Sequence, residues 1–173
     1  MKILIILTLL TFSLFSADNS TKPKDPKTML DGITKHAIKI GSGTQKEAYI
    51  FIDPLCPFSQ KLLTTIINNE ELQNENTYYI FLYRLETFDS DNLIWYIFDS
   101  DDQFSNLEEV MIYHGIINEK ITPSDQTLQA LKEIAEVGKN LDITIRPYTI
   151  SFDKGSKYCK VSSGTATCEE ETW

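Results

Sequence analysis

The spacing of apolar and polar residues along the chain predicts strands and helices in succession. Short apolar and alternating runs predict five strands, at residues 36–40, 49–52, 77–85, 148–152 and 156–161, and Gly41-Ser42-Gly43 predicts a tight turn after the first. The last two flank Asp153-Lys154-Gly155, a sequence typical of a hairpin turn.

The stretches between these strands repeat apolar residues at helical spacing. They predict a helix at 57–68, a helical block at 92–115, and a helix that begins at Thr122-Pro123-Ser124-Asp125 and runs to about residue 140. Two of the strand connections are long enough to be helical crossovers, so the sheet should mix parallel and antiparallel pairs. The pattern as a whole predicts an α/β fold.

The first residues follow the pattern of a secretory signal. Lys2 precedes a short apolar run, and small residues close it. The run falls short of the roughly 20 apolar residues that span a bilayer. We expect a signal peptide at 1–17, a flexible leader at 18–36 and one domain at 37–173. The mature protein would be periplasmic or otherwise exported, with no membrane span.

Charge and ligand spacing narrow the classes of partner. The chain of 173 residues has a net charge of −9, and its basic residues form no stripe, which disfavours nucleic-acid binding. Neither His36 nor His114 has the spacing to the cysteines that metal sites show. We therefore expect no metal and no cofactor.

One motif carries candidate chemistry, the run YIFIDPLCPFSQKLL at residues 49–63. Cys56 stands where the predicted strand gives way to the predicted helix, and Ser59 follows three residues later. Free N–H groups and the macrodipole at a helix N-terminus stabilise a thiolate, which is the reactive form of cysteine. A redox motif usually has a second thiol at the position of Ser59. The alternative is an inert cysteine that only fills space.

The segment IFIDPLCPFSQKL resembles the strand, Asp-Pro, Cys-x-x-Cys and Lys-Leu run of the thioredoxin-fold periplasmic disulfide isomerases of the Dsb type. The segment LDITIRPYTISFDKGSKY, residues 141–158, is similar to the part of that family that holds the cis-proline and the hairpin after it. The resemblance covers residues 38–158. It implies a thioredoxin-like mixed sheet with a helical insertion at about 90–121.

The same resemblance assigns roles to two residues beside Cys56. Pro147 is expected to be a cis-proline stacked against the Cys56 turn, with Arg146 just before it. An arginine near the sulfur would stabilise the thiolate and could hold an acidic group of a substrate. The alternative for Arg146 is a solvent-exposed loop charge, because arginine pairs usefully only with good geometry.

The chain departs from the family pattern in three features, and each changes what we expect of its chemistry, oligomeric state or fold. Ser59 replaces the second cysteine. No dimerisation domain fits before the first strand, so we expect a monomer. Only residues 162–173 follow the last predicted strand, so the closing helix of the fold is expected to be short or missing.

The remaining cysteines are Cys159 and Cys168. An odd number of cysteines in an exported chain implies one free thiol. Pairing Cys159 with Cys168 leaves Cys56 free and would tie the tail to the last strand. The alternative is that this pair forms a second redox centre.

Serine at position 59 cannot attack a mixed disulfide at Cys56, which excludes net dithiol oxidation or reduction within the motif. Isomerisation, glutathione-type exchange and capture of client thiols stay open. We predict monothiol disulfide exchange, isomerase-like, with cysteine-containing exported proteins or an external thiol reductant as partners. The alternative is a non-catalytic thioredoxin-like chaperone or binding module with a vestigial site.

Overall fold

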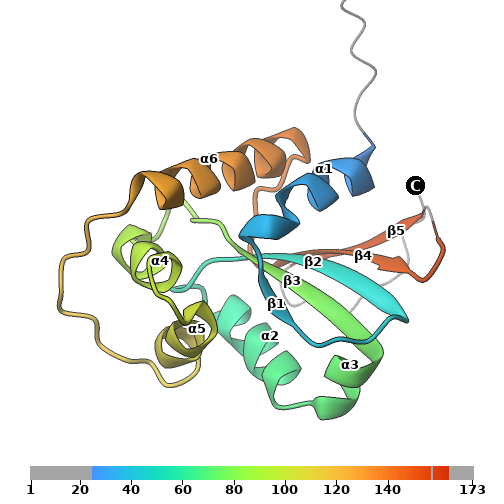
Figure 1. Cartoon of the computed structure of the whole chain (residues 1–173), viewed down its shortest axis with the longest axis horizontal. Coiled ribbons are helices and arrows are strands. Elements are labelled where there is room, and N and C mark those ends of the chain that lie inside the picture. Colours follow the sequence, from blue (N-terminus) through green and yellow to red (C-terminus); the bar gives the residue numbers. More distant parts are fainter. Residues whose placement is uncertain (1–24, 157, 164–173) are drawn as a thin grey trace, which may run out of the picture.

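Five strands form one mixed sheet in the order β1-β3-β2-β4-β5 (Figure 1). The computed structural model describes residues 25–156 and 158–163. The strands are β1 (Ile38–Ile40), β2 (Lys46–Ile52), β3 (Asn76–Leu82), β4 (Tyr148–Asp153) and β5 (Cys159–Ser163). β2 and β3 are parallel and the other three pairs are antiparallel. The predicted mixed sheet is confirmed.

The helices cover both faces of the sheet and one end of it. They are α1 (Pro26–Ile33), the 3₁₀ turn η1 (Thr34–His36), α2 (Pro57–Ile67), α3 (Glu70–Glu75), α4 (Asp91–Phe98), α5 (Gln103–Met111) and α6 (Asp125–Asn140). Figure 1 shows α1 and α6 on one side of the sheet, α2 and α3 on the other, and α4 and α5 together beside the sheet. The predicted helical insertion is therefore two helices, α4 and α5.

The central strand β2 is buried on both faces. Tyr49 and Phe51 lie on one face and Ile50 and Ile52 on the other, and each is at most 1% exposed. Rings stack between β2 and β3, with Phe51 and Phe81 centred 5.0 Å apart. A strand covered on both faces reads as a continuous apolar run, which explains the lack of alternation before Cys56.

Residues 26–36 of the expected leader form the helix α1 and the 3₁₀ turn η1, whereas the sequence pattern indicates only a short helical turn at 29–34. Asp25 caps α1 by accepting a hydrogen bond from the Thr28 N–H at 3.3 Å, and Pro26 takes the first helical position. Leu30 is fully buried. The proline that suggested a loop instead starts a helix. Residues 1–24, with the predicted signal peptide, lie outside the described part.

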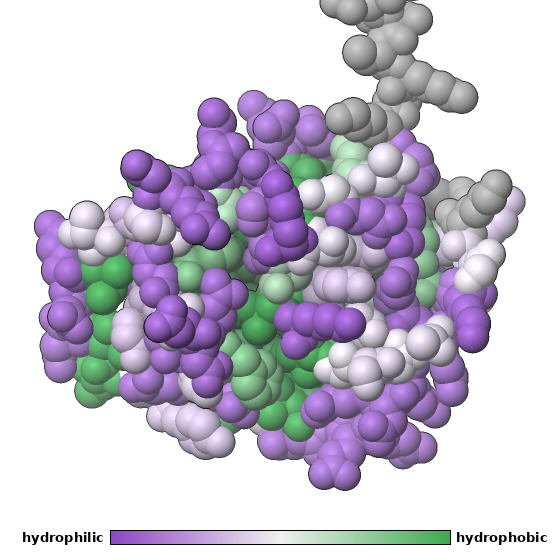
Figure 2. All heavy atoms as spheres, in the orientation of Figure 1, coloured by the Kyte–Doolittle hydropathy of each residue, from purple (hydrophilic) through white to green (hydrophobic). Residues whose placement is uncertain are grey.

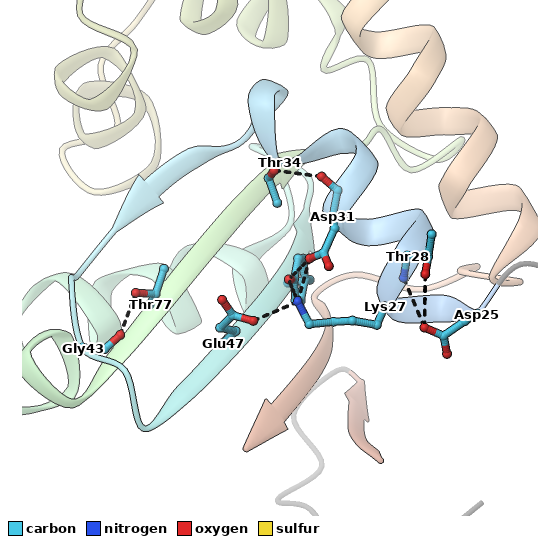
Figure 3. Close-up of polar contacts among 9 residues, drawn as sticks. Asp25, Lys27, Thr28, Asp31, Thr34, Gly43, Glu47 and Thr77 are labelled. Carbon is cyan, nitrogen blue, oxygen red and sulfur yellow. Dashed lines mark hydrogen bonds and ion pairs between the residues drawn. The ribbon is translucent and has the colours of Figure 1, made fainter. Parts of the chain in front are cut away.

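A polar cluster fixes α1 to β2 (Figure 3). The Lys27 ammonium donates to Asp31 and Tyr49 at 2.6 Å each and pairs with Glu47 at 2.8 Å. The Tyr49 hydroxyl donates to Asp31 at 2.5 Å. Burial and this bond to Asp31 raise the pKa of Tyr49 above its ordinary value. The phenol therefore stays a neutral donor, which holds α1 over the sheet.

The start of α6 differs from the prediction by two residues. Ser124 is the N-cap, and Pro123 lies outside the helix. Asp99, at the end of α4, accepts bonds from the Ser124 N–H and hydroxyl and from the Thr127 hydroxyl, at 2.6–3.0 Å. Burial acts to raise the pKa of Asp99, but these bonds lower it below its ordinary value. Asp99 thus joins the insertion to α6.

The β4–β5 hairpin presents a polar face on the side away from α1. Tyr49, which bonds to α1, pairs with Ile150, so Ile150 shares the α1 side and Thr149 and Ser151 face the other way. Their partners in β5 are Ser162 and Lys160. This face offers little apolar surface for a closing helix to cover. The residues after Ser163, where the closing helix of the fold is expected to be short or missing, lie outside the described part of the chain.

Two substitutions in α1 test whether this helix is part of the folded domain. Leu30→Ala should lower the free energy of unfolding by about 2–4 kcal/mol, because it leaves a cavity in the core. Gly32→Ala is the control, since a Cβ at Gly32 meets nothing within 4 Å. It should stabilise the chain by roughly 0.5–1 kcal/mol, the helix cost of glycine. Urea unfolding of the protein measures both, and an unchanged Leu30→Ala variant would mean that α1 does not pack as described.

Candidate active site around Cys56

Cys56 is the N-cap of α2, directly after the turn that ends β2. Its N–H donates to the Asp53 carbonyl at 3.0 Å, and its own carbonyl accepts from the Gln60 N–H at 3.0 Å. Pro57 occupies the first helical position, where a missing N–H costs nothing. The predicted strand-to-helix turn is confirmed. The side chain is 4% exposed.

The cis-proline segment lies against this turn, as the family resemblance implied. The peptide bond between Arg146 and Pro147 is cis. The Cys56 thiol donates to the Arg146 carbonyl at 3.4 Å, although the two residues are 90 positions apart. The predicted cis peptide and its place beside Cys56 are both confirmed.

Ser59 is fully buried on the first turn of α2. Its hydroxyl accepts a hydrogen bond from the Asp53 N–H at 3.4 Å. Within the described part of the chain, the Cys56 thiol bonds to the Arg146 carbonyl and Ser59 bonds to Asp53. The serine therefore supports the turn beneath Cys56.

Asp53 is the site residue that the sequence did not single out. It is fully buried, and its carboxylate accepts from the Leu55 N–H at 2.8 Å, the Leu85 N–H at 2.6 Å and the Ser90 hydroxyl at 2.9 Å. These three bonds tie the Cys56 turn to the loop after β3. The signal in the sequence is an aspartate directly after a wholly apolar strand, where burial requires partners.

Arg146 is neither an exposed loop charge nor a free ligand for a substrate acid. It is 6% exposed. Its guanidinium uses four of its five N–H groups on backbone carbonyls, those of Tyr83, Arg84, Ile143 and Ile145, at 2.8–3.3 Å. The guanidinium carbon also lies 3.7 Å from the centre of the Tyr83 ring. The side chain locks the cis-proline segment to the end of β3.

The site thus encloses the Arg146 guanidinium and the Asp53 carboxyl group, both buried. Burial lowers the pKa of Arg146, while the contacts with Tyr83 and the charges of Asp53 and Cys56 oppose that effect. Arginine keeps its proton at any physiological pH. A negative charge formed on the Cys56 sulfur would therefore lie in the field of Arg146 and of the α2 N-terminus.

Apolar side chains stand exposed at the rim of this network. Leu55 is 37% exposed, Phe58 51% and Ile145 47%. Leu55 and Phe58 flank Cys56 in sequence, and Ile145 precedes Arg146. Large apolar side chains exposed together mark surfaces that bind other molecules.

Of the other two cysteines, the structure describes only Cys159. Cys159 lies half-buried in β5 and is not bonded to Cys56. Cys168 lies outside the described residues, so its pairing with Cys159 stays a prediction. In the described ranges, no group of three or more potential ligand side chains is placed to hold a metal ion. No helix among them is long and apolar enough to cross a membrane.

Comparison with solved structures identifies the fold. No protein-family model and no curated protein sequence matches the chain. The structure of a disulfide interchange protein from Neisseria gonorrhoeae superposes with a TM-score of 0.56 at 16% identity, over 77% of this chain and 88% of that one. The structure of Pseudomonas aeruginosa DsbA2 superposes with a TM-score of 0.61 at 10% identity, over 75% of this chain and 86% of that one.

A periplasmic thioredoxin-like protein from Salmonella enterica serovar Typhimurium gives a TM-score of 0.53 at 11% identity, over 82% of this chain and 88% of that one. At such identities the likeness is one of fold. The chain has the thioredoxin-like fold of the Dsb-type proteins, as the sequence predicted.

The carbonyl contacts of Arg146 predict that lysine cannot replace it. A lysine ammonium is compact and cannot reproduce the planar fork that reaches four carbonyls. Arg146→Lys should therefore lower the free energy of unfolding by about 2–4 kcal/mol, since bonds to charged donors contribute roughly 1.5–3 kcal/mol each. Urea unfolding is the measurement.

Arg84→Lys is the matched control, because Arg84 is half-exposed and pairs with Asp91 on the surface. It should change stability by less than about 1 kcal/mol. Equal effects of the two substitutions would contradict a structural lock at Arg146.

Proposed function

We propose that this protein is an exported thiol-disulfide exchange enzyme that acts through the single thiol of Cys56. The observation that carries the proposal is the position of that thiol, at the N-cap of α2 and 3.4 Å from the carbonyl before the cis-proline. A helix N-terminus is the recognised activating setting for cysteine. One neighbour in fold is a disulfide interchange protein, which is consistent with this chemistry.

The exchange starts with the Cys56 thiolate. It attacks one sulfur of a client disulfide, forms a mixed disulfide, and expels the other client sulfur as a thiolate. A client thiolate then attacks the client sulfur of the mixed disulfide, which forms a new client disulfide and returns Cys56 as a thiolate. The number of disulfide bonds is the same before and after. Isomerisation therefore needs no oxidant or reductant.

Serine at position 59 determines how the mixed disulfide at Cys56 is resolved. A hydroxyl cannot displace sulfur from Cys56, so release waits for a client thiol or an external thiol. In the structure Ser59 supports the turn through its bond with the Asp53 N–H. The proposed division of labour is exchange at Cys56 and positioning at Ser59, Asp53, Arg146 and Pro147.

The proposed partners are cysteine-containing exported proteins and small external thiols. The apolar rim of Leu55, Phe58 and Ile145 would hold unfolded segments next to Cys56. Export rests on the signal-like first residues, and a neighbour in fold is periplasmic. In an oxidising compartment the proposed Cys159–Cys168 bridge would persist.

A second candidate function is a binding or chaperone module without covalent turnover. The observation that favours it is the low exposure of Cys56, 4%, within an exposed apolar rim. Such a surface could hold unfolded chains although the thiol never reacts. The reactivity of Cys56 decides between the two functions.

The first functional prediction concerns Ser59→Cys. A thiol at position 59 lies one helical turn from Cys56, close enough to displace a client from the mixed disulfide. The variant should reduce insulin with dithiothreitol as the recycling thiol at least about tenfold faster than the parent, in line with the kinetic advantage of an intramolecular step. Cys56→Ser in the variant background is the control and should abolish the gain. A variant that forms no disulfide between positions 56 and 59 and gains no turnover would falsify the exchange arrangement and favour the binding module.

The second functional prediction concerns the tail. Peptide mapping of the mature, non-reduced protein should find Cys159 joined to Cys168 and Cys56 alkylated. Reduction of this bridge should lower the free energy of unfolding by about 2–3 kcal/mol, the chain-entropy value for a short loop. Finding Cys56 bonded to either of the other cysteines would overturn the pairing.

A further inference from the structure

A groove follows the outer side of α2 from the residue after Cys56. Its volume is about 530 Å³. One wall is α2 with its C-cap Asn68, and the other is formed by Met111 at the end of α5 and His114 in the connection to α6. The groove belongs to no part of the exchange network described above.

Its lining differs in charge from the rest of the chain. The protein carries a net charge of −9, yet no aspartate or glutamate lines this groove. Three other grooves on the described part of the chain each include at least one such residue. Lys61 and His114 face the groove as cationic or protonatable groups, and neither forms an ion pair with a described residue. The groove is thus electrostatically suited to a carboxylate.

The connection after α5, which contributes His114 to the lining, also carries two exposed side chains. Tyr113 is 72% exposed and Ile116 is 82% exposed. In Figure 2 an apolar patch stands at the left edge of the molecule, where Figure 1 places the connection between α5 and α6, with α5 between this patch and α2. The Tyr113 and Gly115 N–H groups donate to α5 carbonyls at 3.0 and 2.8 Å, so the backbone here is held in place. Exposed tyrosine beside apolar residues is typical of protein-binding surfaces.

The length of the groove matches an extended peptide. The 11 residues of α2 extend about 16 Å at roughly 1.5 Å per residue, enough for about five residues of extended chain at 3.3 Å each. One end starts at Pro57, the residue after Cys56 in the chain. A client joined to Cys56 could therefore lay the adjoining residues along α2.

We propose that this groove binds the client segment next to its reacting cysteine and selects segments that carry acidic side chains. The inference rests on the proposed exchange function. Lys61 supplies the charge selection, and Tyr113 and Ile116, on the connection that carries His114, supply apolar contact. Client choice would then depend on the insertion that carries the connection.

Two synthetic peptides test the selection. Each has one cysteine activated as a 2-pyridyl disulfide, with glutamate in one peptide and lysine in the other at the neighbouring positions. The rate of pyridine-2-thione release by the mature protein, minus the rate of Cys56→Ser, reports attack by Cys56. The glutamate peptide should react about fivefold faster, the effect of roughly one surface ion pair. Lys61→Glu should reverse the preference, and Tyr113→Ser with Ile116→Ser should slow both peptides alike.

Two controls separate this inference from the proposed function. The neutral reagent 2,2′-dithiodipyridine is too small to reach along α2, so its rate should be the same in all groove variants. Lys154→Glu changes the net charge equally but lies in the β4–β5 turn, and it should leave the peptide preference intact.

If dithiodipyridine does not react at Cys56, the exchange function itself fails. If it reacts but the two peptides have equal rates, or if Lys154→Glu acts like Lys61→Glu, the groove does not select clients and the inference is overturned.

Discussion

The buried carboxylate of Asp53 is the constraint on which the arrangement at Cys56 depends. It closes β2 and accepts three hydrogen bonds, from Leu55 in its own turn and from Leu85 and Ser90 beyond β3. A buried charge without partners would be strongly destabilising, so these groups are held together as a unit. The unit fixes the backbone that presents Cys56 to the cis-proline segment.

Arg146 completes the same network from the opposite side. It joins the cis-proline segment to the carbonyls at the end of β3, so that segment and the Cys56 turn share one support. Bonds among buried groups in a low-dielectric interior are costly to break singly. This rigidity explains how a site with one thiol keeps its geometry without a second cysteine at position 59.

The sequence was sufficient to predict those features of the fold and site that depend on neighbouring residues. The apolar run before Cys56, the proline after it and the family-like segment around Pro147 predicted the strand, the helix start and the cis peptide. The sequence did not predict hydrogen bonds between residues far apart in the chain. Leu85 lies 32 positions from its partner Asp53, and Tyr83 lies 63 positions from its partner Arg146. No local pattern reveals that a loop arginine will bond to carbonyls across the sheet.

The spacing of apolar residues also did not predict the full length of α1 or the presence of α3. α1 has only two buried positions, Leu30 and Ile33, and a proline at its start, so the pattern indicates no more than a short helical turn within the expected leader. α3 buries no residue and depends on its cap, in which Asn69 accepts from the Leu72 N–H at 3.0 Å. An amphipathic repeat needs more turns than these helices have before it becomes visible.

The central claim is that Cys56 forms a mixed disulfide that the protein cannot resolve by itself. Intact-protein mass spectrometry of the wild-type chain tests it most directly, with a one-cysteine client peptide activated as a 2-pyridyl disulfide and no added thiol, because attack by Cys56 then releases pyridine-2-thione and leaves no thiol on the client. We predict one client chain attached through Cys56, stable until an outside thiol is added. An unmodified, unreactive Cys56, or release of the client without any added or client thiol, would contradict the account.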